Sequence, residues 1–537
     1  MTPDLRRLVD DWIAGDPDPA ARADLRALSD TELADRFSAP LTFGTAGLRG
    51  PLRAGPNGMN VAVVTRATAG IAAWLQAKCL GGSVVVVGRD GRHGSALFAT
   101  TAAEVLAGAG FSVVLLPGPT PTPVLAYAVR ALGAQLGVQI TASHNPAADN
   151  GYKVYLDGGA QLISPSDREI EAAIAAVGPA VGVPRSPVES ADATSLRADY
   201  LARVAALARG EDRDLRIALT PLHGVGGATA VEALQAARFS EIHTVGIQFA
   251  PDPNFPTVTF PNPEEPGATD ALLQLAASVD ADLAIALDPD ADRCAVGIPT
   301  ADGWRMLSGD ETGAILGDHL LRAQPAGADP LVATTVVSSQ LLGRIAAARG
   351  ARFAQTLTGF KWLVRAGEGL VYAYEEAIGH CVAPDLVRDK DGISAAVVLA
   401  DVAAGLKARG RTLQDVLDDL AVECGVHATM QVSHRVEHLD RITEAMTRLR
   451  ENLPTDLAGE PVSGEDLLLR RGQARTDAVV LSGEHVRVVV RPSGTEPKLK
   501  CYFEAFEPVT SHADLPRARA AAQETLRACA RFSPQLG

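Results

Sequence analysis

Residues 83–110 read SVVVVGRDGRHGSALFATTAAEVLAGAG. An apolar, β-branched run leads into a polar loop that contains glycine, and an alanine-rich stretch with the composition of a helix follows. Continuous apolar strands are typical of parallel sheets, because helices cover both faces of such a sheet. The stretch therefore predicts one strand–loop–helix unit of an α/β fold.

The same order of strand, polar loop and helix recurs, wholly or in part, along the chain. It is found at 215–237 (LRIALTPLHGVGGATAVEALQAA), 282–293 (DLAIALDPDADR) and 331–350 (LVATTVVSSQLLGRIAAARG). A chain of 537 residues is too long for one core, since domains usually hold about 50–250 residues. We therefore expect several α/β units in succession.

The pattern changes near residues 424–434. Beyond that point HATMQVSHRV and HVRVVVRPSG alternate like half-exposed strands, and two helical stretches accompany them. These features predict a smaller α+β domain at the C-terminus. A stretch rich in proline, glycine and serine, residues 177–190, is the best linker candidate.

Composition limits the classes of function. The chain is 47% hydrophobic and carries a net charge of −15, which disfavours nucleic-acid binding. No apolar run reaches the ~20 residues of a membrane span, and acidic residues in 1–15 argue against a secretion signal. The cysteines are scattered without a C-x-x-C motif, which favours reduced thiols in the cytoplasm.

Alternating aspartates mark the loop after the apolar run at 283–287. Asp288, Asp290 and Asp292 can converge, and three like charges repel one another unless a cation lies among them. Carboxylate oxygens select Mg²⁺ or Ca²⁺ over zinc. An EF-hand is excluded because its glycine and glutamate positions hold Arg293 and Pro299. A phosphatase that uses Asp288 as nucleophile, and a solvated acidic turn, remain alternatives.

Two polar loops are candidates for phosphate chemistry. Residues 141–146, TASHNP, place Ser143 and His144 just after an apolar run, where α/β folds usually bind ligands; an ordinary turn is the alternative. Residues 489–504, VVRPSGTEPKLKCYFE, gather a guanidinium and two hydroxyls around one turn that could cradle a phosphate. A simple hairpin loop is the alternative there.

Three further glycine-containing segments are weaker signals. They are LTFGTAGLRG (41–50), LTGFKW (357–362) and AYEEAIGH (373–380). The first two each carry a single cation, and the paired glutamates of the third could hydrogen-bond the vicinal hydroxyls of a sugar.

Taken together, these motifs resemble those of the α-D-phosphohexomutase superfamily, which includes phosphoglucomutases and phosphomannomutases. The serine loop (143–146), metal loop (288–293), sugar loop (374–379) and phosphate loop (491–497) stand in the order that the family shows. The resemblance covers essentially the whole chain. It implies three related α/β domains with mixed or parallel sheets and a C-terminal α+β domain around a central cleft. The boundaries that we expect are 1–185, 190–303, 304–424 and 425–537.

The resemblance also implies roles for individual residues. Ser143 would carry the transferred phosphoryl group and also contribute to the metal site, where Asp288, Asp290 and Asp292 would hold Mg²⁺. Lys153 or His144 would move the proton, and Arg49 would line the reaction centre. The implied substrate-binding residues are Arg293, Thr358, Gly359, Lys361, Glu375, Lys390, Arg491, Ser493, Gly494 and Thr495. Asp389 and Asp391 fit a catalytic-cleft loop with less definite roles.

The implied reaction converts a sugar 1-phosphate to the 6-phosphate through a sugar 1,6-bisphosphate, which is also the activator. Ala377 stands where phosphoglucomutases commonly have serine. The sugar loop is therefore similar to that of phosphopentomutases and glucose-1,6-bisphosphate synthases, and glucose, mannose and pentose all stay open, with hexose preferred. Small sugar phosphates are the expected partners, without nucleic acid or membrane. The sequence gives no indication of the oligomeric state.

Overall fold

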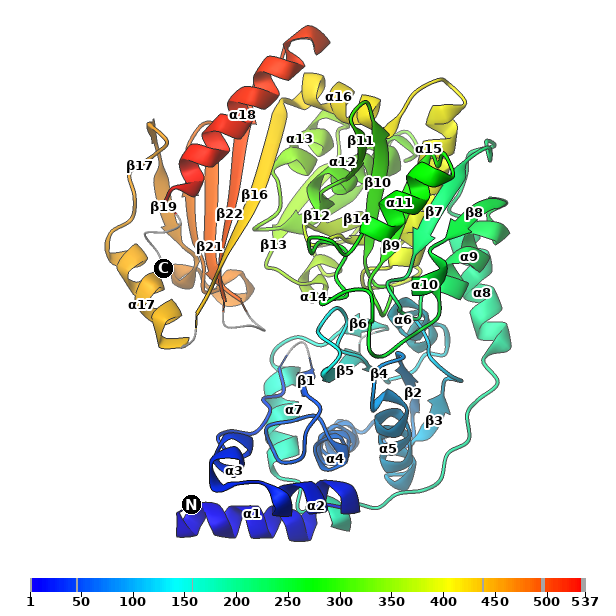
Figure 1. Ribbon diagram of the computed structural model, residues 1–537, viewed down its shortest axis with the longest axis vertical. Helices are drawn as coiled ribbons and strands as arrows, with labels where there is room; N and C mark the ends of the chain where they lie inside the picture. The colour runs from blue at the N-terminus through cyan, green and yellow to red at the C-terminus, as the bar shows by residue number, and fades with distance from the viewer. Residues whose placement is uncertain (1, 45–46, 157, 437–438, 494–497, 533–537) are drawn as a thin grey trace. The chain divides into compact units, whose positions relative to one another are not determined.

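The computed structural model describes residues 2–44, 47–156, 158–436, 439–493 and 498–532. The chain divides into two compact units, residues 1–306 with 379–408, and residues 307–378 with 409–537. Each unit combines sheets with helices that cover them (Figure 1). Among the described residues no helix is both long and apolar enough to cross a membrane.

The first sheet of unit 1 follows the order β1-β5-β4-β2-β3, and β6 (Ala160–Gln161) pairs with β5. Strands β2, β3 and β4 are parallel, while β5 runs antiparallel to both β4 and β1. The strand bounds are β1 (Leu48–Pro51), β2 (Val84–Arg89), β3 (Ser112–Leu115), β4 (Leu136–Ile140) and β5 (Asp149–Leu156). The apolar run at the start of 83–110 thus forms strand β2, as predicted, and it lies between β4 and β3.

Helices cover this sheet because alternate strand residues bury opposite faces. Val85, Val87 and Val138 share one core with α4 (Val61–Ala77), α5 (Ser95–Gly108) and α7 (Ser166–Ala175). Helix α6 (Thr122–Ala131) packs on β2 and β4. Two short N-terminal helices, α1 (Pro3–Gly15) and α2 (Pro19–Ala27), pack together ahead of α3 (Asp30–Arg36).

The second sheet of unit 1 repeats this topology. Its order is β11-β10-β9-β7-β8, with β7, β8 and β9 parallel and β10 antiparallel to β9. The strand bounds are β7 (Arg216–Thr220), β8 (Glu241–Thr244), β9 (Leu283–Leu287), β10 (Cys294–Thr300) and β11 (Gly303–Met306). Helix α11 (Asp270–Ser278) packs on β7 and β9, and α15 (Gly392–Lys407) packs on β9, β10, α8 (Thr194–Ala205) and α9 (Gly227–Ala236).

Unit 2 holds a third parallel set in the order β13-β12-β14. Its bounds are β12 (Leu331–Thr335), β13 (Arg352–Thr356) and β14 (Leu370–Glu375), with α12 (Gly309–Arg322), α13 (Leu341–Ala348) and α16 (Leu413–Cys424) packed together beside it. In all three sets the first strand in sequence is central and the second and third lie on either side of it. The three α/β repeats expected from the sequence are therefore related in topology.

The C-terminal sheet of unit 2 is antiparallel, in the order β16-β22-β21-β20-β19. Its bounds are β16 (Val426–Arg435), β19 (Ser463–Asp466), β20 (Val479–Ser482), β21 (Val486–Pro492) and β22 (Lys498–Glu507), and α18 (Leu515–Ala530) packs across β22 and β16. The α+β character predicted for this region is confirmed. Helix α17 (Leu439–Glu451) contributes Ile442 and Met446 to its core.

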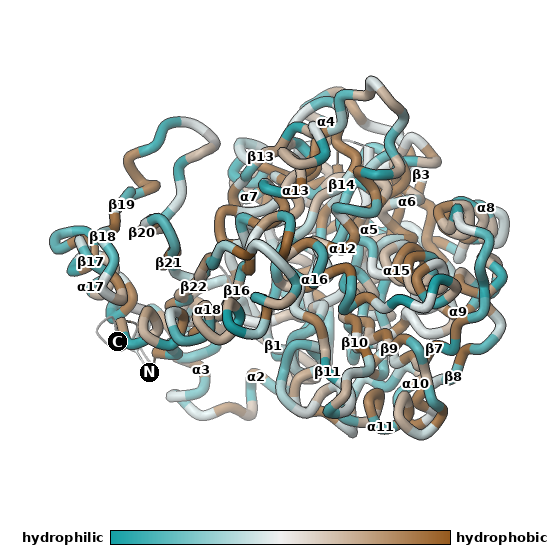
Figure 2. Tube along the Cα trace, turned by 90° about the horizontal axis from the view of Figure 1, so that it is seen from above, coloured by the Kyte–Doolittle hydropathy of each residue, from teal (hydrophilic) through white to brown (hydrophobic). Residues whose placement is uncertain are grey.

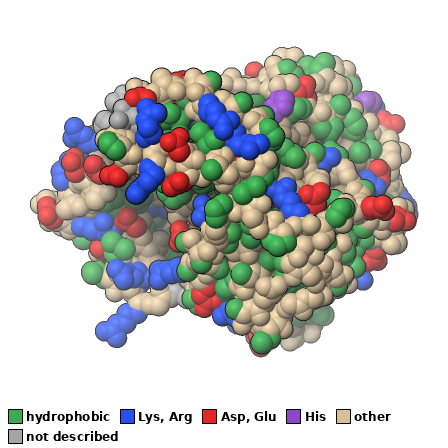
Figure 3. Space-filling view, turned by 90° about the horizontal axis from the view of Figure 1, so that it is seen from below, with side chains coloured by type: hydrophobic (Ala, Val, Ile, Leu, Met, Phe, Trp, Pro, Cys, Tyr) green, Lys and Arg blue, Asp and Glu red, His purple; other side chains and the backbone are tan. Residues whose placement is uncertain are grey.

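Hydropathy and charge follow this organisation. The trace alternates between hydrophobic and hydrophilic stretches, as buried strands and exposed loops require (Figure 2). On the face shown in Figure 3, Lys and Arg side chains are interspersed with Asp and Glu. The net charge of −15 therefore does not produce a uniformly acidic surface on that face.

Candidate active site

The serine loop lies at the carboxyl end of β4. Ser143 is 3% exposed and has a positive φ of 53°, a conformation that is uncommon for residues other than glycine. Its backbone N–H donates to Thr141 Oγ1 at 2.9 Å. Its hydroxyl donates to Asp288 Oδ2 at 2.9 Å and lies 3.2 Å from His144 Nδ1. The backbone thus aims the hydroxyl at the first aspartate of the metal loop.

Arg92 binds the backbone of the serine loop through hydrogen bonds. Its guanidinium donates to the carbonyls of Ser143 (2.5 Å), Asn145 (2.7 Å), Pro146 (2.8 Å) and Asp149 (3.3 Å). Arg92 is 4% exposed, so these bonds and an ion pair with Asp90 at 3.2 Å satisfy a buried charge. The guanidinium fixes the path of the serine loop through its backbone.

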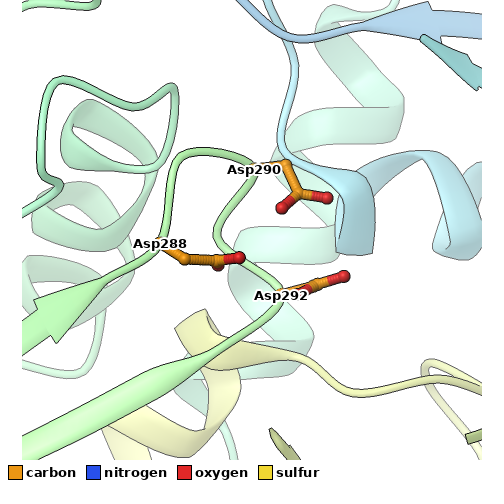
Figure 4. A group of neighbouring side chains, drawn as sticks. All are labelled: Asp288, Asp290 and Asp292. Atoms are coloured by element: carbon orange, nitrogen blue, oxygen red, sulfur yellow. The ribbon is translucent and has the colours of Figure 1, made fainter. Parts of the chain in front are cut away.

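The three aspartates follow β9 and lie on one loop before β10 (Figure 4). All three are fully buried, and ligand oxygens of the set lie within 4.8 Å of one another. Burial, followed by repulsion from Asp290 and Asp292, raises the pKa of Asp288 well above its ordinary value. Ser143 and Asp288 thus meet from equivalent positions, because each follows the third strand of its parallel set.

Two lysines form ion pairs with the aspartates and compensate part of their negative charge. Lys153 on β5 contacts Asp290 at 2.7 Å and Asp292 at 2.8 Å, and Lys390 contacts Asp292 at 3.0 Å. Burial opposes the charged form of Lys153, but the attraction of Asp290 and Asp292 outweighs it and raises the pKa of this ammonium. Lys153 therefore stays protonated in this environment.

The carboxylates retain acceptors that fit a divalent cation. Within the described part of the chain, Oδ1 of Asp290 and Oδ1 of Asp292 are buried and accept no hydrogen bond. Hard carboxylate oxygens without donors are the ligands that Mg²⁺ prefers, and leaving them bare inside a protein is costly. Thr122 Oγ1 donates to Asp290 Oδ2 at 2.5 Å, and the N–H of Arg293 donates to Asp288 Oδ1 at 3.1 Å, so the loop is already oriented.

Further predicted residues surround the same centre. Arg49 on β1 donates to Asn145 Oδ1 at 3.0 Å, and Arg293 Nε lies 3.9 Å from Asp292 Oδ1. Burial, together with Arg293 and Arg49, lowers the pKa of His144 well below its ordinary value. The imidazole is therefore neutral at pH 7, and its protonation is disfavoured in this environment.

The loop before α15 also belongs to unit 1, and it brings Lys390 to the metal loop. Asp389 accepts hydrogen bonds from Tyr155 Oη at 2.9 Å and Gln161 Nε2 at 2.7 Å. Asp391 caps α15 through the N–H groups of Ile393 and Ser394. Burial raises the pKa of Asp391 to about 6. These contacts make Asp391 a structural support and leave Lys390 directed at the metal loop.

The remaining predicted residues lie in unit 2. Glu375 ends β14, while Thr358, Gly359 and Lys361 follow β13 at the same edge of the parallel set. Arg491 lies on β21, and the N–H of Ser493 donates to the Lys498 carbonyl at 2.8 Å. Gly494 and Thr495 lie outside the described residues.

Sequence reasoning missed Arg92, Asp90 and Thr122. The first two were detectable, because GRDGR directly follows the apolar run of 84–87, much as SHNP and DPDAD come after the apolar runs of their own strands. The side chain of Thr122, whose backbone N–H also donates to the Asp290 carbonyl at 2.9 Å, had no such signal.

Models of known protein domains match four successive stretches of the chain. Four phosphoglucomutase/phosphomannomutase domain models match: α/β/α domains I (residues 40–179), II (198–301) and III (308–423), and the C-terminal domain (437–518). A "Probable phosphomannomutase" of Haemophilus influenzae is 42% identical over 83% of this chain and 93% of its own length. The chain belongs to the phosphoglucomutase/phosphomannomutase family.

Other members of the phosphoglucomutase/phosphomannomutase family agree in extent but differ in named substrate. The human phosphopentomutase is 33% identical, covering 89% of this chain and 87% of its own. A Staphylococcus aureus phosphoglucomutase is 31% identical, and the match covers 91% of this chain and 94% of the relative. The crystal structure of a "putative phosphomannomutase" from Thermus thermophilus matches with a TM-score of 0.71 and 26% identity, covering 91% and 99%. As a family member this chain is an intramolecular phosphotransferase that isomerises its substrate.

Proposed function

We propose that this enzyme interconverts a hexose 1-phosphate and the 6-phosphate, with glucose or mannose as the sugar, through phospho-Ser143. The observation that carries the proposal is the hydrogen bond from Ser143 to Asp288, which joins a buried nucleophile to an acidic cluster with free acceptors. The family membership fits the same reaction class.

In the proposed cycle, phospho-Ser143 gives its phosphoryl group to the free hydroxyl of the sugar monophosphate, whose proton leaves as the new P–O bond forms. The product is a sugar 1,6-bisphosphate. This intermediate reverses its orientation in the site, so that the Ser143 oxygen takes back the other phosphoryl group. The bond to the opposite sugar oxygen breaks, and that oxygen regains a proton. Such transfer depends on positioning and charge stabilisation more than on covalent chemistry.

The described residues supply these tasks. His144, whose Nδ1 lies 3.2 Å from Ser143 Oγ, or Lys153 would move the proton, and protonated Lys153 can stabilise charge or return a proton. Asp288, Asp290 and Asp292 would hold Mg²⁺, which, when bound, neutralises charge on the transferring group. The low exposure of Ser143, 3%, would limit the access of water to the phosphoserine.

A pentose 1-phosphate is the second candidate substrate, with conversion to the 5-phosphate. Ala377 in the sugar loop favours it, and human and mouse relatives named phosphopentomutase are 33% and 34% identical. A site without the serine hydroxyl lacks one hydrogen bond to the sugar, which would change the preference between sugars.

The test compares α-glucose, α-mannose and ribose 1-phosphates as substrates, with Mg²⁺ and a trace of glucose 1,6-bisphosphate, for wild type and Ser143→Ala. We expect hexose conversion by wild type and none by the variant. Conversion of ribose 1-phosphate alone would replace the hexose assignment, and activity that survives in Ser143→Ala would refute the serine mechanism.

A further inference from the structure

Unit 2 contains a cavity of about 610 Å³ apart from the predicted site residues. Helix α13 and strand β13 supply one wall, and strands β16, β20, β21 and β22 of the C-terminal sheet supply the other. We call it the α13 cavity. Its volume falls in the range of about 300–1,000 Å³ that small-molecule sites occupy. No residue of the predicted catalytic or phosphate sites is among its described lining residues.

A buried hydrogen-bonded pair lies in the wall that the C-terminal sheet supplies. His427 Nδ1 and Glu504 Oε1 are 2.8 Å apart, and their side chains are 2% and 7% exposed. The same Glu504 oxygen accepts from Ser339 Oγ at 2.6 Å and from the N–H of Gln340 at 2.8 Å. These bonds fix the carboxylate and the imidazole where the parallel set meets the C-terminal sheet.

Three polar atoms of this group have no hydrogen-bond partner among the described residues. They are Glu504 Oε2, Gln340 Nε2 and His427 Nε2, and all three are buried. The carboxylate oxygen requires a donor, the amide requires an acceptor, and the imidazole nitrogen can take either role. A hydroxyl donates and accepts at once, so the hydroxyl groups of a polyol match the chemistry of this set. Leaving all three unpaired would cost stability, because buried polar groups are normally satisfied.

Charged groups of both signs line the same cavity: Arg344, Arg470 and Arg487, and Glu465, Glu484 and Glu504. Among the described residues Arg470 pairs with Glu465, whereas Arg344 and Arg487 form no ion pair. Arg344 is exposed and stacks on the Phe506 ring, with Cζ 3.8 Å from the centroid. Arg487 is half-buried, and its guanidinium donates to the carbonyls of Val336 and Ser338. Guanidinium groups bind phosphates in bidentate fashion, and stacking holds the Arg344 plane in place.

We propose that the α13 cavity is a second, non-catalytic binding site for a phosphorylated polyol, such as a sugar phosphate. The hydroxyl groups would satisfy Glu504, Gln340 and His427, while the phosphate would bind Arg344 and Arg487. A bare anion would leave the Glu504 carboxylate facing like charge, and a neutral sugar would not use the arginines. The inference is independent of the proposed catalytic substrate, since it rests on different residues.

The test counts bound ligands per 537-residue chain. Equilibrium dialysis with radiolabelled glucose 6-phosphate and, separately, sorbitol 6-phosphate is run on Ser143→Ala, which cannot exchange phosphoryl groups with the ligand. The pocket variant adds Gln340→Met and Arg344→Gln, which remove one unpartnered amide and one exposed guanidinium. The control adds Arg352→Gln, which removes an exposed arginine that pairs with Asp329 outside the cavity.

We expect the pocket variant to bind one of these ligands with an equivalent fewer per chain than its parent, through at least a tenfold weakening at that site, while the control matches the parent. Equal binding by parent and pocket variant for both ligands would overturn the proposal. Failure of the catalytic proposal gives a different signature, because the cavity equivalent would persist in a chain that turns over no sugar phosphate.

Discussion

Removal of the Arg92 guanidinium tests how the serine loop is positioned. Arg92→Met deletes four hydrogen bonds to loop carbonyls and leaves Asp90 buried without its charge partner. Breaking a buried ion pair by removing one member typically costs about 3–5 kcal/mol. We expect Arg92→Met to lower the free energy of unfolding by that amount. Displacement of a nucleophile by about 1 Å can cost roughly 100-fold in rate, so kcat should fall by about that factor.

Urea unfolding measures the first effect, and steady-state kinetics at a temperature where the variant stays folded measures the second. Asp90→Asn/Arg92→Met removes both charges, so its cost should be smaller than the sum of the two single variants. Arg92→Lys keeps the charge but lacks the planar fork, and should recover stability better than kcat. The control is Arg197→Gln, since Arg197 forms an exposed pair with Glu232; its effect should stay within about 1 kcal/mol.

Two results would refute this reasoning. If Arg92→Met lost no more stability than the Arg197→Gln control, the buried guanidinium would not be holding the loop. If stability fell while kcat of the folded variant matched wild type, the clamp would be structural and would not position Ser143.

Three further predictions follow from the described geometry. Burial raises the pKa of Asp310 to about 7 from 3.8, so the folded state binds the extra proton and wild type should lose up to ~4 kcal/mol of stability as the pH rises from about 4 to 7. Asp310→Asn should flatten that slope in urea unfolding at pH 4.5 and 7.5, and an unchanged slope would contradict the assignment. A Cβ on Gly392 would lie 2.3 Å from the Arg293 carbonyl oxygen, so Gly392→Ala should lower Tm by several degrees, whereas Gly178→Ala, which meets nothing within 4 Å, should not; equal Tm values would count against the packing argument. A chelator should abolish mutase activity and Mg²⁺ should restore it, while Asp292→Asn should stay below about 1% of wild type at any Mg²⁺ concentration; full activity in either case would remove the metal from the account.

Sequence reasoning reached the repeated units and the C-terminal α+β domain because their cues are local. Apolar runs such as 84–87 and 283–287 became central or inner strands of parallel sets. The alternation in HATMQVSHRV likewise became the half-exposed strand β16. Such periodicity is fixed by which faces a strand must bury.

The sequence predicted most of the residues of the site but not the contacts between them. Nothing in the spacing of 143 and 288 states that Ser143 would donate to Asp288, because that contact joins two separate sheets. The position of Arg92 after a strand was detectable, but its partners were not, since it donates to backbone carbonyls, which carry no sequence signal. The division of Lys153 between two carboxylates depends on the same long-range packing.

The central claim is that Ser143 carries the phosphoryl group. Its most direct test is mass-spectrometric mapping of the phosphate after wild-type enzyme is incubated with ³²P-labelled glucose 1,6-bisphosphate and Mg²⁺, with Ser143→Ala treated in parallel. We expect an acid-stable phosphate on the peptide that contains Ser143, and no label in the variant. An acid-labile label on the peptide that contains Asp288, or equal labelling of both proteins, would contradict it.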